Sequence, residues 1–267
     1  MNVLKSYFTD EFERQKRKEL IVLMNDWKKV ISKKDKIVFR DDGEAYDSKD
    51  YFNTDGFFPG YFSAKKRVLF IGRESRCISG EDRIESDLKN FKDLEPSASS
   101  YWRRLLYITY GIRHNGKYKF EEIPNANDIL AQMLDSNDFG FAIMNISKYS
   151  NDCDDGASAD YELINRFLED SELDKRNFVQ EEIELLSPSV IITANLWNGE
   201  IKKELINAAF PEKLFSEGIG LQNNEACLYD YRLGKKTIKL RDLFHFSSRK
   251  SDAEYFYNPV MKLLFSR

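Results

Sequence analysis

Polar side chains follow four short apolar runs of the sequence, each at the point where the run stops. The first run ends in Gly72-Arg73-Glu74-Ser75-Arg76, which places a carboxylate between two guanidiniums, and the second ends at Asn145. The third continues into "TANLWNG" and the fourth into "LFHFSSRKS", which contains His245 and Ser247. A carboxylate and an imidazole can exchange protons with a ligand, and an amide offers both a hydrogen-bond donor and an acceptor. These residues make a candidate site wherever the chain brings the four run ends together.

All four segments look like strands, the first of them typical of a strand covered on both faces, and helical stretches separate them. This alternation predicts an α/β fold: a three-layer α/β/α sandwich with a mainly parallel four-stranded central sheet. Ligands in such folds bind at the carboxyl ends of the strands, which is where the polar residues stand. The expected strands are Val68–Gly72, Phe141–Ile146, Val190–Ala194 and Thr237–Leu243.

Shorter signals indicate where several of the other elements begin and end. Asn125 is placed to cap a short helix, and Ser251 with Glu254 has the spacing of a capping box at the start of the C-terminal helix. Leu233-Gly234-Lys235 lies between two β-like runs and predicts a hairpin that leads into the last strand. Further helices are expected at 99–112, 127–134, 161–168, 174–186 and 200–209.

The first 60 residues differ from the alternating part that follows. Met1 to about Ile31 has the apolar spacing of one or two helices, and residues 39–62 are rich in Asp, Gly and aromatic rings, which suits a long ordered loop. We therefore expect residues 1–60 to form a helical and loop extension packed on the core, and residues 61–267 to form one α/β domain.

Composition narrows the possible classes of protein. Of 267 residues, 42% are hydrophobic and 32% charged, which is typical of a soluble globular chain, and no apolar run is long enough to cross a bilayer. No signal peptide is evident, so we expect a cytoplasmic protein without a membrane partner. With three dispersed cysteines and two histidines, a four-cysteine zinc or iron–sulfur site is excluded, and we expect neither metal nor cofactor. The net charge of −4 argues against indiscriminate coating of nucleic acid.

The order of these motifs resembles that of the uracil-DNA glycosylase superfamily, of which the chain looks like a divergent member. Gly72–Arg76 stands in the place of the family's first motif, and Asn145-Ile146-Ser147-Lys148 is partly similar to its second. "ELLSPSVIITA" is similar to a helix-to-strand motif of the family, and His245-Phe246-Ser247 resembles its last motif. The resemblance covers about 67–264. It implies the glycosylase-like fold and a hydrolase of the DNA-repair type, which cleaves the N-glycosidic bond of a base flipped out of nucleic acid, DNA rather than RNA.

The resemblance also implies roles for individual residues. Glu74 would activate the attacking water, and His245 would donate a hydrogen bond to the departing base, so these two are the expected catalytic residues. Asn145, with Gly72 and Arg73, would bind the base. The expected contacts to the phosphate backbone are Arg76, Lys148, Ser247, Ser248, Arg249 and Lys250.

Several positions depart from the family pattern and keep other interpretations open. Glu74 is one methylene longer than the usual Asp, which moves the carboxylate by about 1 Å. Ser75 and Phe246 stand where the family has prolines. The aromatic ring that stacks on the base has no clear match, and its candidates are Tyr101, Trp102 and Tyr149. The chain is therefore alternatively a catalytically degenerate module that binds a base, nucleotide or nucleic acid. Glu74 is alternatively a surface ion-pair partner of Arg73 or Arg76, and His245 a structural residue.

Overall fold

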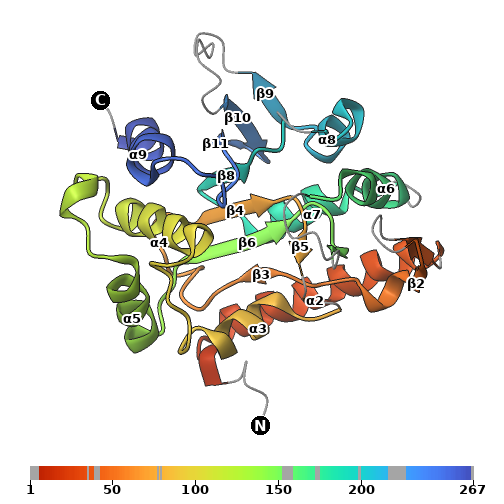
Figure 1. Ribbon diagram of the computed structural model, residues 1–267, viewed down its shortest axis with the longest axis horizontal. Coiled ribbons are helices and arrows are strands. Elements are labelled where there is room, and N and C mark those ends of the chain that lie inside the picture. Colours follow the sequence, from red (N-terminus) through yellow and green to blue (C-terminus); the bar gives the residue numbers. More distant parts are fainter. Residues whose placement is uncertain are drawn as a thin grey trace.

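A computed structural model of the protein describes residues 6–34, 36–38, 43–76, 78, 80–151, 159–171, 175–197, 200–215 and 227–265. Its central feature is a seven-stranded sheet in the order β3-β6-β4-β8-β11-β10-β9 (Figure 1). β6, β4, β8 and β11 pair in parallel, while β3, β10 and β9 join the edges antiparallel. The sheet is thus mixed and wider than the four strands expected. The strands are β3 Gly56–Phe57, β4 Val68–Gly72, β6 Phe141–Asn145, β8 Val190–Ala194, β9 Lys213–Phe215, β10 Cys227–Leu233 and β11 Lys236–Leu243.

The hairpin predicted around Gly234 is confirmed. β10 and β11 pair antiparallel with Leu233 opposite Lys236, so that Gly234 and Lys235 form a two-residue turn. Gly234 has φ +58°, a left-handed conformation that glycine adopts without strain.

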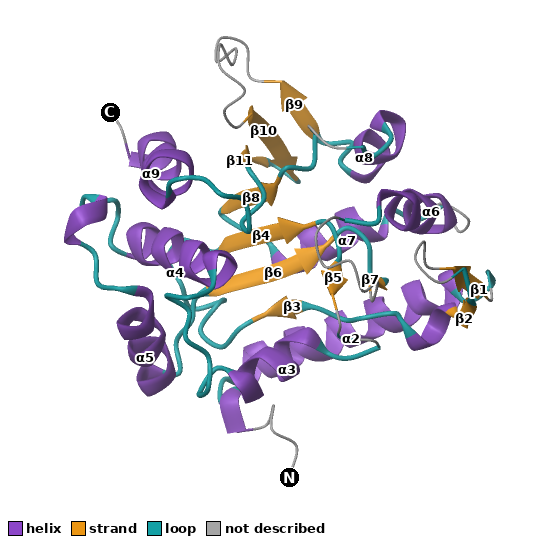
Figure 2. Ribbon diagram, viewed as in Figure 1, coloured by secondary structure: helices purple, strands orange, loops and turns teal. Residues whose placement is uncertain are grey.

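Helices flank the sheet in two groups. α4 Ser100–Arg113 contacts α5 Ala126–Ser136 and α9 Asn258–Phe265, which continues from the π-helical turn Ala253–Tyr257. α2 Glu11–Ile31 contacts α6 Tyr161–Ser171 and α7 Phe178–Leu186, and both α6 and α7 contact α8 Lys203–Ala209. Figure 2 shows α4 and α5 on one side of β4 and β6, with α6 and α7 on the other.

Capping side chains set several helix starts. Asn125 Oδ1 accepts from the Asp128 N–H at 3.0 Å, as its position predicts, and Ser251 Oγ accepts from the Glu254 N–H at 3.3 Å. Helix α3, Arg83–Asn90, was not expected, although Asp82 caps it by accepting from the Glu85 N–H at 3.0 Å.

The N-terminal segment takes part in the central sheet and its core. β3, which lies within residues 1–60, pairs with β6 of the central sheet. The indole of Trp27, on α2, is fully buried against Phe178 of α7. β1 Lys36–Val38, just before the aromatic stretch at 39–62, pairs with β2 Ala45–Asp47 within it, and the 3-10 turn Ser48–Asp50 follows. The rings of this stretch pack inward, since Phe57, Phe58 and Tyr61 are fully buried.

The position of a ligand site follows from the strand order. In chain order the four parallel strands are β4, β6, β8 and β11, so β6-β4-β8-β11 reads 2-1-3-4 and reverses between β4 and β8. Such a reversal opens a crevice at the carboxyl ends of the two strands. Beyond these ends, β5 Ser75–Arg76 pairs in parallel with β7 Ser150–Asn151 and orders the segment that follows β4.

Candidate functional site

A pocket of about 610 Å³ lies at the carboxyl ends of β4 and β11. Five separate segments line it: the residues after β4, helix α3, the start of α4, the start of α6 and the loop after β11. Its lining residues are Arg73, Glu74, Ser75, Arg76, Ile78, Arg83, Asp87, Tyr101, Ala159, Tyr161, His245, Ser247 and Ser248. Glu74 and His245, the two residues expected to act in catalysis, therefore share one pocket.

Glu74 is held by one of its two carboxylate oxygens. Oε1 accepts from Asn151 Nδ2 at 2.9 Å and from the Asp160 N–H at 3.0 Å. Oε2 is buried and has no hydrogen-bond partner among the described residues. Burial raises the pKa of the Glu74 carboxyl above its usual range, and the nearby Asp160 charge adds to this, while Arg73 opposes it. No ion pair joins Glu74 to Arg73 or Arg76 in the described part of the chain, so the surface ion-pair interpretation is not supported.

Two arginine–tyrosine pairs stand in the pocket wall. Arg73 donates to the Tyr161 hydroxyl, and its guanidinium lies 5.3 Å from the centre of that ring. Arg83 donates from Nη2 to the Tyr101 hydroxyl at 3.2 Å and lies 5.4 Å from the centre of the Tyr101 ring. Each tyrosine therefore orients one guanidinium through a hydrogen bond and a cation–π contact.

His245 is oriented by its own loop. The Ser247 backbone N–H donates to Nδ1 of the imidazole at 3.3 Å. Because Nδ1 accepts, a neutral ring carries its proton on Nε2, and Nε2 makes no hydrogen bond within the described residues. Burial, together with the charges of Arg73 and Arg104, lowers the pKa of His245 to about 4. At neutral pH the residue is therefore a neutral hydrogen-bond donor at the pocket.

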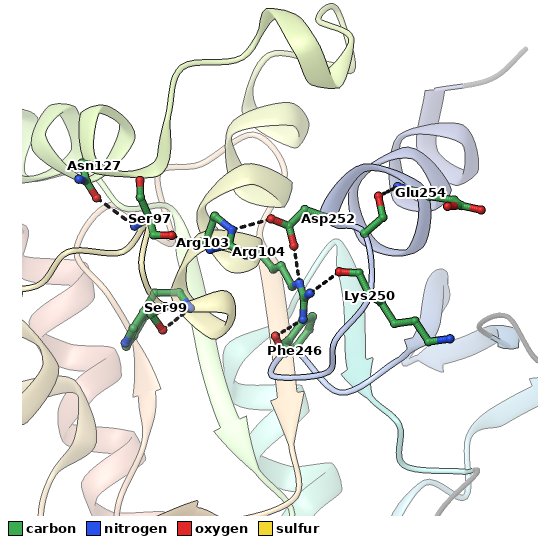
Figure 3. Close-up of polar contacts among 11 residues, drawn as sticks. Ser97, Ser99, Arg103, Arg104, Asn127, Phe246, Lys250, Asp252 and Glu254 are labelled. Carbon is green, nitrogen blue, oxygen red and sulfur yellow. Dashed lines mark hydrogen bonds and ion pairs between the residues drawn. The ribbon is translucent and has the colours of Figure 1, made fainter.

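A buried arginine fixes the loop that carries His245 (Figure 3). Arg104, on α4, is 2% exposed and donates to the carbonyl oxygens of Phe246 and Lys250, the latter at 2.7 Å. Its Nε pairs with Asp252 Oδ1 at 2.7 Å, and its guanidinium lies 3.9 Å from the centre of the Phe256 ring. The loop conformation is thus set by α4 and by aromatic packing, since Phe246 is itself buried.

The phosphate contacts expected on this loop separate into two groups. Ser247 and Ser248 line the pocket, and the Ser248 hydroxyl is buried without a partner among the described residues. Arg249 and Lys250 do not line the pocket. The Lys250 ammonium lies over two rings, 4.8 Å from the centre of Phe244 and 5.0 Å from that of Tyr255.

Asn145 lies one layer below the pocket rather than in its wall. The residue is 4% exposed, and its Nδ2 donates to the Ser75 hydroxyl at 2.8 Å. Its side chain covers Gly72, where an added Cβ would stand 2.3 Å from Asn145 Oδ1. The backbone N–H of Asn145 donates to Asp55 Oδ2 at 2.6 Å. Asn145 and Gly72 therefore support Ser75, which does line the pocket.

Lys148 must be withdrawn from the expected phosphate contacts. Its side chain is 1% exposed, and Nζ lies 2.7 Å from both Asp55 Oδ1 and Glu182 Oε2. The ammonium also lies 5.1 Å from the centre of the Trp27 ring. Because the ammonium is paired with two buried carboxylates, it does not contact a ligand in the pocket.

The third strand end does not join the site. Asp242 of β11 accepts from the Thr193 hydroxyl at 2.6 Å and from the backbone N–H groups of Leu196 and Trp197 at 2.9 and 3.2 Å. The Thr193 side chain and the backbone at 196 and 197 are thus tied to β11, and residues 198–199 lie outside the described part of the chain.

Other lining residues were not expected from the sequence. Of the three stacking candidates only Tyr101 lines the pocket, because Tyr149 is fully buried against Phe167 and Trp102 packs on Phe91. Arg83, Asp87 and Tyr161 were missed. A capping pattern at Asp82-Arg83-Ile84-Glu85, with Ile84 and Leu88 on one face, is the signal that would have revealed α3 and with it Arg83 and Asp87.

Among the described residues, no group of three or more His, Cys, Asp or Glu side chains is arranged to hold a metal ion. None of the helices described is both long and apolar enough to span a bilayer.

Comparison with known proteins gives no assignment. No family model matches the chain, and no curated protein matches it significantly. The residues of the pocket are therefore the basis on which a function can be inferred.

Proposed function

We propose that the protein is a hydrolase that cleaves the N-glycosidic bond between a base and a sugar phosphate, the chemistry that the resemblance to uracil-DNA glycosylases implies. One observation carries the proposal. A buried carboxylate oxygen of Glu74 that has no hydrogen-bond partner among the described residues lines the same pocket as a neutral His245, whose Nε2–H makes no hydrogen bond to those residues.

The proposed reaction uses these two groups on opposite sides of the bond that breaks. A water oxygen bonds to the anomeric carbon as the bond from this carbon to the base nitrogen breaks, and Glu74 Oε2 accepts a proton from that water. The ionised Glu74 also stabilises the positive charge that develops on the sugar. The His245 Nε2–H donates a hydrogen bond to the base as it leaves with the bonding electrons. The products are a sugar with a hydroxyl at its anomeric carbon and the base anion, which takes up a proton from solvent while Glu74 releases the one that it accepted.

The surroundings of Glu74 support its role as a base. Donors from Asn151 and Asp160 fix Oε1, so the carboxylate cannot rotate freely and Oε2 keeps one direction. Burial raises the pKa of the Glu74 carboxyl, which makes the carboxylate a stronger proton acceptor than an exposed one. A general base works best when its pKa lies near the working pH.

A binding module of the same fold remains the second candidate. Asn145, expected to read the base, already donates to Ser75, and Glu74 Oε2 can accept a hydrogen bond from a ligand without any reaction. Such a protein would hold a base or nucleotide in the same pocket and leave it intact.

The decisive experiment measures release of free base. The full chain is incubated in excess with each substrate, and chromatography measures the released base. The substrates are single- and double-stranded DNA and RNA, containing uracil or unmodified bases, and free nucleotides. Base release that Glu74→Gln abolishes, and that the matched surface variant Glu184→Gln retains, supports the hydrolase. Binding without release, from folded protein, supports the binding module instead.

A further inference from the structure

We infer that the pocket takes a free nucleoside monophosphate, whose phosphate is held by Arg83 and Arg73 inside the pocket, rather than a base flipped out of a polymer. This inference rests on the proposed glycosidic chemistry and narrows its substrate class.

Arg83 lies deep in the wall of the pocket. Its side chain is 14% exposed, yet it lines the pocket. Nη2 donates to Tyr101, Nε lies 3.4 Å from Asp87 Oδ2, and Nη1 makes no hydrogen bond in the described part of the chain. A recessed guanidinium with a free edge suits the terminal phosphate of a small molecule, which can enter the pocket entirely.

Asp87 is a weak competitor for that guanidinium. The 3.4 Å separation from Nε is at the long limit of a hydrogen bond, and Asp87 contacts the guanidinium at this one nitrogen. A phosphate with three acceptor oxygens can therefore satisfy Arg83 better than Asp87 does.

The second argument is where the other cations lie. A protein that binds a polynucleotide contacts several successive phosphates with exposed Lys and Arg side chains. Of the cations expected to do this, Lys148 is buried between Asp55 and Glu182. Arg249 and Lys250 are exposed but lie outside the pocket lining, so they do not reach a phosphate inside the pocket. Two guanidiniums, those of Arg73 and Arg83, instead line the pocket itself, where a ligand's phosphate can contact them.

The third argument is size. A pocket of about 610 Å³ falls within the range of roughly 300–1,000 Å³ that encloses small molecules. In the proposed pose the phosphate contacts Arg83 and Arg73, and the sugar and base extend toward Glu74 and His245, which line the same pocket. Water and a nucleoside monophosphate then give a free base and a sugar 5-phosphate.

The test compares ligands that differ only in the phosphate or in chain length. Calorimetry with the Glu74→Gln protein measures ligand binding. The ligands are AMP, GMP, CMP, UMP, their deoxy counterparts, the matching nucleosides and a 15-nucleotide single strand. Base release is measured with the wild type. We expect at least one nucleotide to bind ten-fold or more tightly than its nucleoside and to release its base.

Variants locate the phosphate. Arg83→Gln should remove most of the ten-fold advantage of the nucleotide, whereas Arg232→Gln, on β10 at the far edge of the sheet, should retain it. Should Arg83→Gln fail to fold, inorganic phosphate competing with the nucleotide, but not with the nucleoside, on the otherwise unaltered chain would support the same assignment.

Each outcome separates this inference from the function on which it rests. Base release from the oligonucleotide but from no nucleotide overturns the inference and leaves the hydrolase standing. Phosphate-dependent nucleotide binding without base release supports the ligand class and overturns the hydrolase. Equal affinity for nucleotide and nucleoside overturns the inference whether or not base is released.

Discussion

The Ser247 backbone N–H donates to Nδ1 of His245 at 3.3 Å, and this contact places the proton of a neutral imidazole on Nε2. The pKa of His245 is lowered to about 4, mainly by burial, so the neutral form persists through the physiological range. The loop is built to keep an uncharged donor at the pocket.

This arrangement predicts how stability depends on pH. An unfolded chain binds a proton at His245 near pH 6.5, but the folded chain does so only near pH 4, so the folded state loses stability as pH falls through that window. Above about pH 6.5 the effect is absent. Urea unfolding at pH 7.0, 5.5 and 4.5 should show a shallower acid-side loss for His245→Gln than for wild type, and equal losses in the two proteins would contradict the lowered pKa.

Arg104 should matter more for stability than its neighbour Arg103. Arg104→Ala removes the contacts to Phe246, Lys250 and Asp252 and leaves acceptors unsatisfied, which should lower the free energy of unfolding by about 2–4 kcal/mol (Figure 3). The Arg103 side chain is 25% exposed, so its truncation should cost only about 1 kcal/mol. Denaturant unfolding measures both, and equal costs would show that the buried contacts do not fix the loop.

Gly72 should be coupled to Asn145. An alanine Cβ at position 72 would stand 2.3 Å from Asn145 Oδ1, so Gly72→Ala must displace the amide and should cost about 1–3 kcal/mol. Removing the amide should relieve the clash, so that Gly72→Ala costs less in an Asn145→Ala background than in wild type. A double-mutant cycle by thermal unfolding measures this, and additive effects would speak against the contact.

Lys148 should behave as a structural residue. Lys148→Met leaves Asp55 and Glu182 buried without their cation and should lower the free energy of unfolding by about 3–5 kcal/mol. Lys202→Met, which breaks an exposed pair with Glu169, should cost less than about 1 kcal/mol. A fully stable Lys148→Met protein with weakened ligand binding would restore Lys148 to the predicted phosphate contacts.

The parallel core of the fold could be predicted because strands such as Val68–Gly72 and Val190–Ala194 are largely apolar runs bounded by polar residues. The edge strands could not. Gly56–Phe57 is only two residues long within an aromatic-rich stretch, and its pairing with β6 depends on contacts distant in sequence.

The residues of the site likewise differ in whether the sequence alone can predict their positions. Topology alone was enough to expect Glu74 and His245 at the same edge of the sheet, because parallel strands end together. The burial of Lys148 depends on Asp55 and Glu182, which come from unrelated segments, and no local pattern reveals such partners. Arg83 was missed because its helix was missed.

The central claim is that Glu74 and His245 act on one ligand. Its most direct test is a crystal structure of the Glu74→Gln protein with a ligand that the wild type hydrolyses. The account predicts the base within about 2.6–3.2 Å of His245 Nε2 and the anomeric carbon facing residue 74, with room for one water between them. A ligand bound outside this pocket, or a base turned away from His245, would contradict it.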